Sequence, residues 1–261
     1  MFALPDYRIL LYSGAEFRFG CRPPVPVTNM NHYTHPLSEC RVLVFDLDGT
    51  LIDSKQDLVV SVNAVRAHFG HGDLDAEKVS EYVGDGAAML VRRALGETAT
   101  ERDVEAALRF FIQHYRAHML AHTLPYPGVR ETLEVLAPRR MAVLTNKPVR
   151  ISRDIIHALG LSRFFSCIYG GDSFECKKPD PMGLAAILDE LGVSPRQAMM
   201  VGDSDVDIQT ARNAGTWACG ATYGFQAERL TACAPDLLLD RFQDLPRHLS
   251  MLAALPPTKQ T

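Results

Sequence analysis

The sequence predicts a doubly wound α/β protein, in which a parallel sheet lies between two layers of helices and a helical domain is inserted after the first strand. Three observations lead to this fold class. Short apolar runs alternate with stretches of helical period, each run ends in a polar or glycine-rich turn, and one long gap in the series holds only helical patterns. Strands that are apolar on both faces suit burial between helices, and alternation with helices implies parallel pairing.

The predicted strands begin after residue 41, where short apolar runs replace a sequence without a regular period. They cover residues 42–45, 141–144, 167–169, 198–201, 216–218 and 237–239. Helical periods occur between them at 150–159, 181–191 and 206–214. The carboxyl ends of parallel strands meet at one edge of a sheet, so we expect the turns after these strands to lie close together.

The gap between the first two predicted strands contains helical patterns at 57–69, 76–82, 87–95 and 102–121. This is far more chain than one crossover needs. We expect a helical cap at 57–125, an α/β core formed by 41–56 and 126–252, and a short tail at 253–261. A cap in this position would lie over the ligand crevice of the sheet.

Residues 1–40 show no convincing period and include a proline-rich piece at 22–26. We expect a poorly ordered extension, with Met30 a possible true start of the chain. A targeting or oligomerisation arm is the other interpretation, and the sequence does not separate the two. The sequence does not indicate the oligomeric state either.

The composition excludes several classes of protein. The 27 basic and 31 acidic side chains give a net charge of -4, so no basic field is available for nucleic acid or a membrane surface. The six cysteines include no CxxC pair, and the chain has neither a signal-peptide pattern nor an apolar run long enough to span a bilayer. We expect a cytoplasmic protein with reduced thiols.

The densest polar turn follows the first predicted strand, where Asp46 and Asp48 stand two residues apart in the segment DLDGTL. Two carboxylates that point the same way at a strand end need a cation or a shared proton. Mg²⁺ would compensate one charge, and a proton retained on the other would create a general acid. Gly49 allows a sharp turn and brings backbone N–H groups towards a bound anion.

Three later turns add complementary groups. Thr145 and the amides after it can donate to an oxyanion, and Lys178 can act as a point charge on phosphate. The turn after the fourth strand carries Asp203 and Asp207 in GDSDVD. Acids at two neighbouring strand ends indicate a hard-cation site made of oxygen ligands.

The order DxDGTL, hydrophobic-Thr-Asn, Lys-Pro and GDxxxD resembles that of the haloacid dehalogenase-like phosphohydrolase superfamily over about residues 42–252. Within it, the stretches GDGAAMLVRRAL, LTNKP, GGDSFECKKPDP and VGDSDVDIQTARNAG are most similar to phosphoglycolate phosphatases. The resemblance implies a Rossmann-like core with a helical cap, dependence on Mg²⁺ and hydrolysis of a small phosphorylated metabolite.

The resemblance also implies a role for each acidic motif residue. Asp46 would be the nucleophile that forms an aspartyl phosphate. Asp48 would protonate the leaving alkoxide and then accept a proton from the attacking water. The carboxylates of Asp46 and Asp203 and the backbone carbonyl of Asp48 would hold Mg²⁺.

The remaining motif residues would bind or orient the phosphoryl group. Thr145 and Lys178 would contact its equatorial oxygens, with Asn146 also in the substrate site. We choose Lys178 over Lys177 because it directly precedes the proline. Asp207 would orient the metal shell and Lys178 without ligating the metal.

Other functions stay open on the same fold. The substrate would most readily be 2-phosphoglycolate, but a sugar-phosphate phosphatase or a β-phosphoglucomutase-like phosphomutase would use the same core. A non-catalytic binding protein would be expected to lack the nucleophile or a metal carboxylate, and this chain has both.

Overall fold

The computed structural model describes residues 37–251, within which six parallel strands form one sheet. The strands are β1 (Val42–Phe45), β4 (Arg140–Leu144), β5 (Cys167–Tyr169), β6 (Ala198–Gly202), β7 (Trp217–Ala221) and β8 (Leu237–Leu239). Their order across the sheet is β5-β4-β1-β6-β7-β8, and every neighbouring pair is parallel. The predicted fold class is confirmed.

The strand β7 differs most from its prediction, because it runs three residues beyond 218. Its first residues pair with β6, and Cys219–Ala221 pair with β8. Pairing on both sides therefore keeps the chain extended through Gly220, which the apolar pattern alone did not indicate.

The order of the strands reverses at β1, which lies in the middle of the sheet. From β1 the chain proceeds to β4 and β5 on one side, and it returns to β6, β7 and β8 on the other. A crevice forms where the connections diverge in this way, outside the carboxyl ends of the central strands. The turns after β1, β4 and β6 border this crevice.

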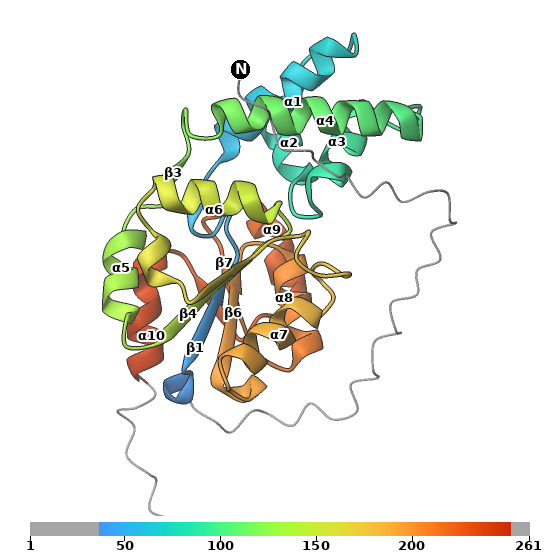
Figure 1. The fold of residues 1–261 in the computed structure, drawn as a ribbon. Helices are drawn as coiled ribbons and strands as arrows, with labels where there is room; N and C mark the ends of the chain where they lie inside the picture. Colours follow the sequence, from blue (N-terminus) through green and yellow to red (C-terminus); the bar gives the residue numbers. More distant parts are fainter. Residues whose placement is uncertain (1–36, 252–261) are drawn as a thin grey trace, which may run out of the picture. The chain divides into compact units, whose positions relative to one another are not determined.

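Helices cover both faces of the sheet (Figure 1). Val42 and Val44 belong to a core with α7 (Met182–Glu190), α8 (Asp205–Ala214) and α9 (Ala227–Leu230). The alternate residues of β1, Leu43 and Phe45, belong to a second core on the opposite face. That core includes residues of α5 (Val129–Leu136), α6 (Val149–Ala158) and α10 (Leu245–Met251). The sequence patterns had not indicated α5, α9 or α10.

The inserted segment between β1 and β4 forms four helices and a small ribbon. The helices are α1 (Lys55–His68), α2 (Ala76–Tyr82), α3 (Ala87–Leu95) and α4 (Glu101–His118). The chain leaves the core through β2 (Ile52–Asp53) and returns through β3 (Leu124–Pro125), and these two strands pair antiparallel. The division into core and cap at residues 57 and 125 stays a prediction.

The helix α4 ends three residues earlier than predicted, and its end has a local cause. The backbone N–H groups of His122 and Thr123 donate to the buried carboxylate of Asp57. These bonds tie the end of the insert to the first turn of α1. The chain therefore turns towards β3 and the core.

Short 3-10 turns complete the described chain. They are Leu37–Glu39, Ser162–Phe164, Pro195–Gln197, Thr231–Cys233 and Phe242–Asp244. The first belongs to the end of the predicted extension 1–40, and it packs with α10. Residues 1–36 of that extension and the predicted tail 253–261 lie outside the described residues. Within 37–251, no helix is both long enough and apolar enough to cross a membrane.

Candidate active site

Asp46 and Asp203 lie side by side because they follow the paired strands β1 and β6. Phe45 is in register with Val201, and the N–H of Asp46 donates to Val201 O at 2.9 Å. Both carboxylates are buried, and the N–H of Phe225 donates to Asp203 Oδ2 at 2.6 Å. The parallel register thus brings together two acids that are 157 residues apart in the sequence.

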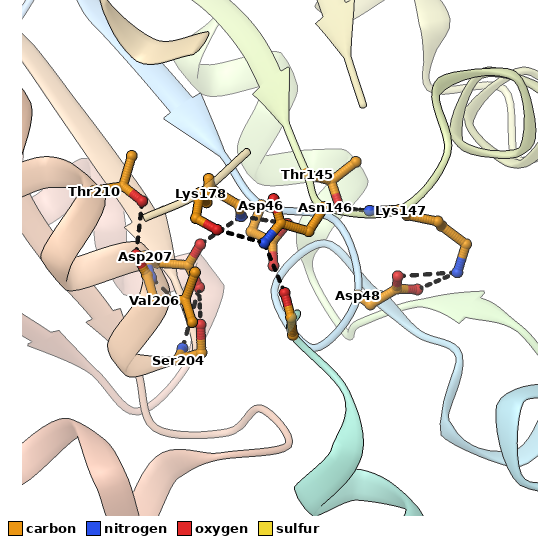
Figure 2. A network of polar contacts seen from close by, with 11 residues as sticks. Asp46, Asp48, Thr145, Asn146, Lys147, Lys178, Ser204, Val206, Asp207 and Thr210 are labelled. Carbon is orange, nitrogen blue, oxygen red and sulfur yellow. Dashed lines mark hydrogen bonds and ion pairs between the residues drawn. The ribbon is translucent and has the colours of Figure 1, made fainter. Parts of the chain in front are cut away.

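Lys178 bridges two carboxylates (Figure 2). Its Nζ lies 2.9 Å from Asp46 Oδ1 and 2.6 Å from Asp207 Oδ1, and only 5% of the residue is exposed. The neighbouring Lys177 is exposed, and its Nζ donates to the carbonyl of Asp85 at 2.5 Å. Of this pair of lysines, it is therefore Lys178 whose charge reaches the acidic cluster.

Asp207 is held in place by the start of α8. Ser204 Oγ donates to Asp207 Oδ2 at 2.6 Å, and the N–H of Asp207 donates back to Ser204 Oγ at 3.4 Å. One oxygen of Asp207 therefore contacts Lys178 and the other contacts Ser204. This arrangement suits the predicted role of Asp207 in orienting Lys178.

Three carboxylates cluster at the candidate cation site, and Asp46 and Asp203 are the two that are predicted to ligate the metal. Asp46, Asp203 and Asp207 each offer an oxygen within 4.8 Å of the others. Burial raises the pKa of Asp46 to about 6 and the pKa of Asp203 well above its usual range, which opposes ionisation without a cation. Clustered, buried oxygen ligands fit a hard divalent cation such as Mg²⁺.

The turn after β1 approaches Asp203 closely at Gly49. This glycine has φ +79°, and a Cβ there would lie 2.1 Å from Asp203 Oδ2. Only a residue without a side chain fits both the backbone conformation and the space. The sequence analysis attributed Gly49 to the sharp turn and to the approach of backbone N–H groups to an anion, and it did not predict the closeness to Asp203.

The side chain of Asp48 faces a different partner from that of Asp46. Lys147 Nζ lies 2.8 and 2.9 Å from its two oxygens, and Ser54 Oγ donates to its Oδ1 at 2.5 Å. Lys147 also donates to the Tyr115 hydroxyl on α4 at 2.8 Å. Asp48 is thus linked to both the core and the inserted helices, and the metal contact predicted for its backbone carbonyl stays a prediction.

Burial alone would lower the pKa of Lys147, but the charge of Asp48 and the contacts with Tyr115 together raise it above the ordinary value. Lys147 therefore stays charged although only 8% of it is exposed. The sequence analysis quoted Lys147 in its strand-end turn and gave it no role. Its position directly after Thr145 and Asn146 was a signal that could have been used.

Thr145 and Asn146 follow β4 at the same edge of the sheet. Thr145 is buried, and its Oγ1 accepts from the N–H of Lys147 at 3.2 Å. Asn146 Nδ2 donates to Gly84 O at 2.8 Å and to Lys178 O at 2.9 Å, so it connects the insert with the loop after β5. Both line the cavity described next, and their contacts with substrate stay predictions.

A cavity lies between the inserted helices and the strand ends. Its acidic lining consists of Asp46, Asp48 and Asp203, and α4 and α6 contribute part of its apolar wall. Apolar residues on this wall are Leu58, Phe111, Ile112, Ile151 and Phe225. The loop at Gly84 and Gly86 also borders the cavity.

Most of the predicted site residues converge at this edge. The cavity is lined by Asp46, Asp48, Thr145, Asn146 and Asp203. Lys178 contacts Asp46. Asp207 lies behind Lys178. The sequence analysis missed the partners Ser54, Tyr115 and Lys147, of which Tyr115 carried no signal because it is one of several aromatic residues on a helix.

Comparisons with known proteins show the family to which this chain belongs. The family model described as haloacid dehalogenase-like hydrolase matches residues 43–221. Phosphoglycolate phosphatase 1 of Pseudomonas aeruginosa is 40% identical over 213 residues, covering 78% of each chain. Phosphoglycolate phosphatase of Chromobacterium violaceum is 41% identical over 198 residues, covering 72% of this chain and 88% of its own.

Among solved structures, that of a protein described as a predicted phosphoglycolate phosphatase from Haemophilus somnus 129pt aligns with a TM-score of 0.76 and 32% identity. It covers 80% of this chain and 97% of its own. The chain therefore belongs to the haloacid dehalogenase-like hydrolases. Within that family it is a phosphoric monoester hydrolase similar to phosphoglycolate phosphatases.

Proposed function

We propose that this enzyme hydrolyses 2-phosphoglycolate to glycolate and phosphate, depends on Mg²⁺, and uses Asp46 as the nucleophile of an aspartyl-phosphate intermediate. The observation that carries the proposal is the buried bridge of Lys178 between Asp46 and Asp207 beside Asp203. A cation that contacts the nucleophile can also contact the phosphoryl oxygens that approach it. The relatives named phosphoglycolate phosphatase support the choice of substrate.

In the first step, an oxygen of Asp46 attacks phosphorus in line with the leaving alkoxide. Lys178 and the Thr145 hydroxyl stabilise the equatorial oxygens as charge develops on them. Asp48 enters this step protonated and donates its proton to the alkoxide, so glycolate leaves as an alcohol and Asp48 becomes a carboxylate. In the second step, Asp48 takes a proton from the water that cleaves the acyl phosphate.

Mg²⁺ would be held by Asp46 and Asp203, with the carbonyl of Asp48 as a further ligand, and it would neutralise charge between the anionic nucleophile and the anionic substrate. Asp207 then keeps Lys178 turned towards Asp46, because its own oxygens contact Lys178 and Ser204.

The inserted helices would shield the site from bulk water and leave room for the water molecule that cleaves the intermediate. Three polar contacts hold their lower edge on the core: Asn146 to Gly84 O, Lys177 to Asp85 O and Gln226 to Val83 O. A cap that closes over the site protects the aspartyl phosphate from side reactions with solvent.

We place the enzyme in the cytoplasm, acting on a small phosphorylated metabolite and on neither nucleic acid nor a membrane. The net charge of -4 supports this placement. So do the five described cysteines, which are all free thiols.

The test is steady-state phosphate release with Mg²⁺ and with EDTA. The panel is 2-phosphoglycolate, glucose 6-phosphate, β-glucose 1-phosphate, pyrophosphate and an aryl phosphate. We expect 2-phosphoglycolate to lead in kcat/KM by an order of magnitude or more, with activity lost in EDTA. Another leading ester would refute the substrate and leave the chemistry standing. Turnover of β-glucose 1-phosphate only with a bisphosphate activator would indicate a mutase.

A further inference from the structure

A second buried lysine, Lys147, lines the cavity, whereas Lys178 is not among the residues that line it. Lys147 Nζ contacts both oxygens of Asp48 and the Tyr115 hydroxyl, and it lies 4.5 Å from the centre of the Tyr115 ring. The proposed chemistry gives this ammonium no task. This ammonium is paired with Asp48, and it also lines the cavity, so a substrate group that enters the cavity can reach it.

The charged groups of the cavity leave one cation within reach of a second anionic group on the substrate. The lining of the cavity carries the carboxylates of Asp46, Asp48 and Asp203, and among the described residues that line it Lys147 is the one cationic side chain. Lys178 serves the phosphoryl end through its contact with Asp46. A substrate with a second anionic group would therefore find one cation for that group, and it is Lys147.

We propose that Lys147, assisted by the Tyr115 hydroxyl, is the specificity-determining residue that binds a carboxylate on the substrate. This inference rests on the proposed function and deepens it. It explains how one site could prefer a phosphorylated carboxylic acid to a phosphomonoester whose alcohol part is uncharged. The apolar wall would disfavour an unpaired carboxylate, and Lys147 supplies the partner.

The geometry provides two donors for a carboxylate. The ammonium is on a flexible stem and can exchange one oxygen of Asp48 for an oxygen of the substrate. The Tyr115 hydroxyl accepts its hydrogen bond from Lys147, so its own hydrogen can donate to the second substrate oxygen. Ser54 Oγ continues to hold Asp48 during this exchange.

The competing explanation is that Lys147 only neutralises Asp48. In that case its loss would impair all substrates alike, because Asp48 acts on the leaving oxygen of each. A carboxylate-binding role would instead change the ratio between a substrate with a carboxylate and one without.

The experiment compares kcat/KM for 2-phosphoglycolate and 2-hydroxyethyl phosphate, which has a neutral alcohol in place of the carboxylate. Wild type, Lys147→Met, Lys147→Arg and Tyr115→Phe are measured. Lys78→Met, at an exposed lysine of α2 that pairs with Glu81, is the matched control. We expect Lys147→Met to lower the ratio roughly ten- to a hundredfold, mainly through KM, as for loss of a charged hydrogen bond. Lys147→Arg should retain part of the ratio, and Tyr115→Phe should lower it severalfold.

The outcomes separate the two proposals. If wild type prefers 2-phosphoglycolate and Lys147→Met keeps that preference, the role of Lys147 is refuted and the proposed function stands. If wild type hydrolyses both esters equally well, both the substrate and the carboxylate site are refuted.

Binding measured by calorimetry in an Asp46→Asn background gives the same ratio without turnover. It decides the question if Lys147→Met is inactive. If Lys147→Met does not fold, Tyr115→Phe, which leaves the pair of Lys147 and Asp48 intact, decides it: an unchanged ratio in that variant overturns the proposal.

Discussion

Replacing Lys178 with methionine removes the cation between two buried carboxylates while keeping a side chain of similar length. In wild type the ammonium lies 2.9 Å from Asp46 and 2.6 Å from Asp207, and without it both carboxylates are left uncompensated. Breaking a buried ion pair by removing one partner costs about 3–5 kcal/mol of stability. We expect a loss of this size for Lys178→Met at pH 8 in EDTA.

The loss should shrink at lower pH. The pKa of Asp46 in the folded protein is raised to about 6, mainly by burial, against about 3.9 for an unfolded aspartate. The contribution of Asp46 to the free energy of unfolding is fully present below the unfolded pKa. It is lost as the pH rises through the folded pKa. At pH 5 Asp46 is largely neutral, so Lys178→Met then breaks mainly the contact with Asp207.

The assay is urea unfolding of wild type, Lys178→Met and Lys177→Met at pH 5 and pH 8, with kcat/KM measured alongside. Loss of one oxyanion donor costs about 3–4 kcal/mol of transition-state stabilisation, which is roughly a hundred- to a thousandfold in rate. Lys177 is exposed and should matter much less. The reasoning is refuted if Lys178→Met is as stable as wild type at pH 8, or if both lysine variants lose activity equally.

Two further predictions concern the backbone turn and the insert. Gly49→Ala should abolish stabilisation by Mg²⁺ in thermal unfolding, because the new Cβ would lie 2.1 Å from Asp203 Oδ2. Gly70 has nearly the same φ and open space around it, so Gly70→Ala should retain the stabilisation by Mg²⁺. Asp57→Ala should lose about 2–4 kcal/mol at pH 7 through its broken hydrogen bonds. Burial would raise the pKa of Asp57, but hydrogen bonds from Thr123 and His122 lower it below the ordinary value. The loss of stability in Asp57→Ala should therefore fade below about pH 4 in acid unfolding. An Asp57→Ala loss that does not vary with pH, or a metal response retained by Gly49→Ala, would contradict these accounts.

The sheet could be predicted from the sequence because its strands are apolar on both faces and stand between helical periods. The strand order could not, because pairing depends on which runs meet across the fold. The short ribbon of β2 and β3 was missed for a related reason, since two residues per strand give no periodic signal.

The acidic centre could be predicted because strand-end turns with fixed residue types carry it. The parallel register of β1 and β6 brings Asp46 and Asp203 together, and Lys178 contacts Asp46 from the loop after β5. The environment of Asp48 could not be predicted. Its contact with Lys147 spans 99 residues, and the contact of Lys147 with Tyr115 requires the insert to lie on the core.

The most direct test of the central claim is to identify the phosphorylated residue. Enzyme with Mg²⁺ and 2-phosphoglycolate is quenched in acid during turnover, and its peptides are mapped by mass spectrometry. We predict a hydroxylamine-sensitive acyl phosphate on Asp46, and none in Asp46→Asn, which should also be inactive. A phosphoryl group on another residue, or turnover by Asp46→Asn, would contradict the account.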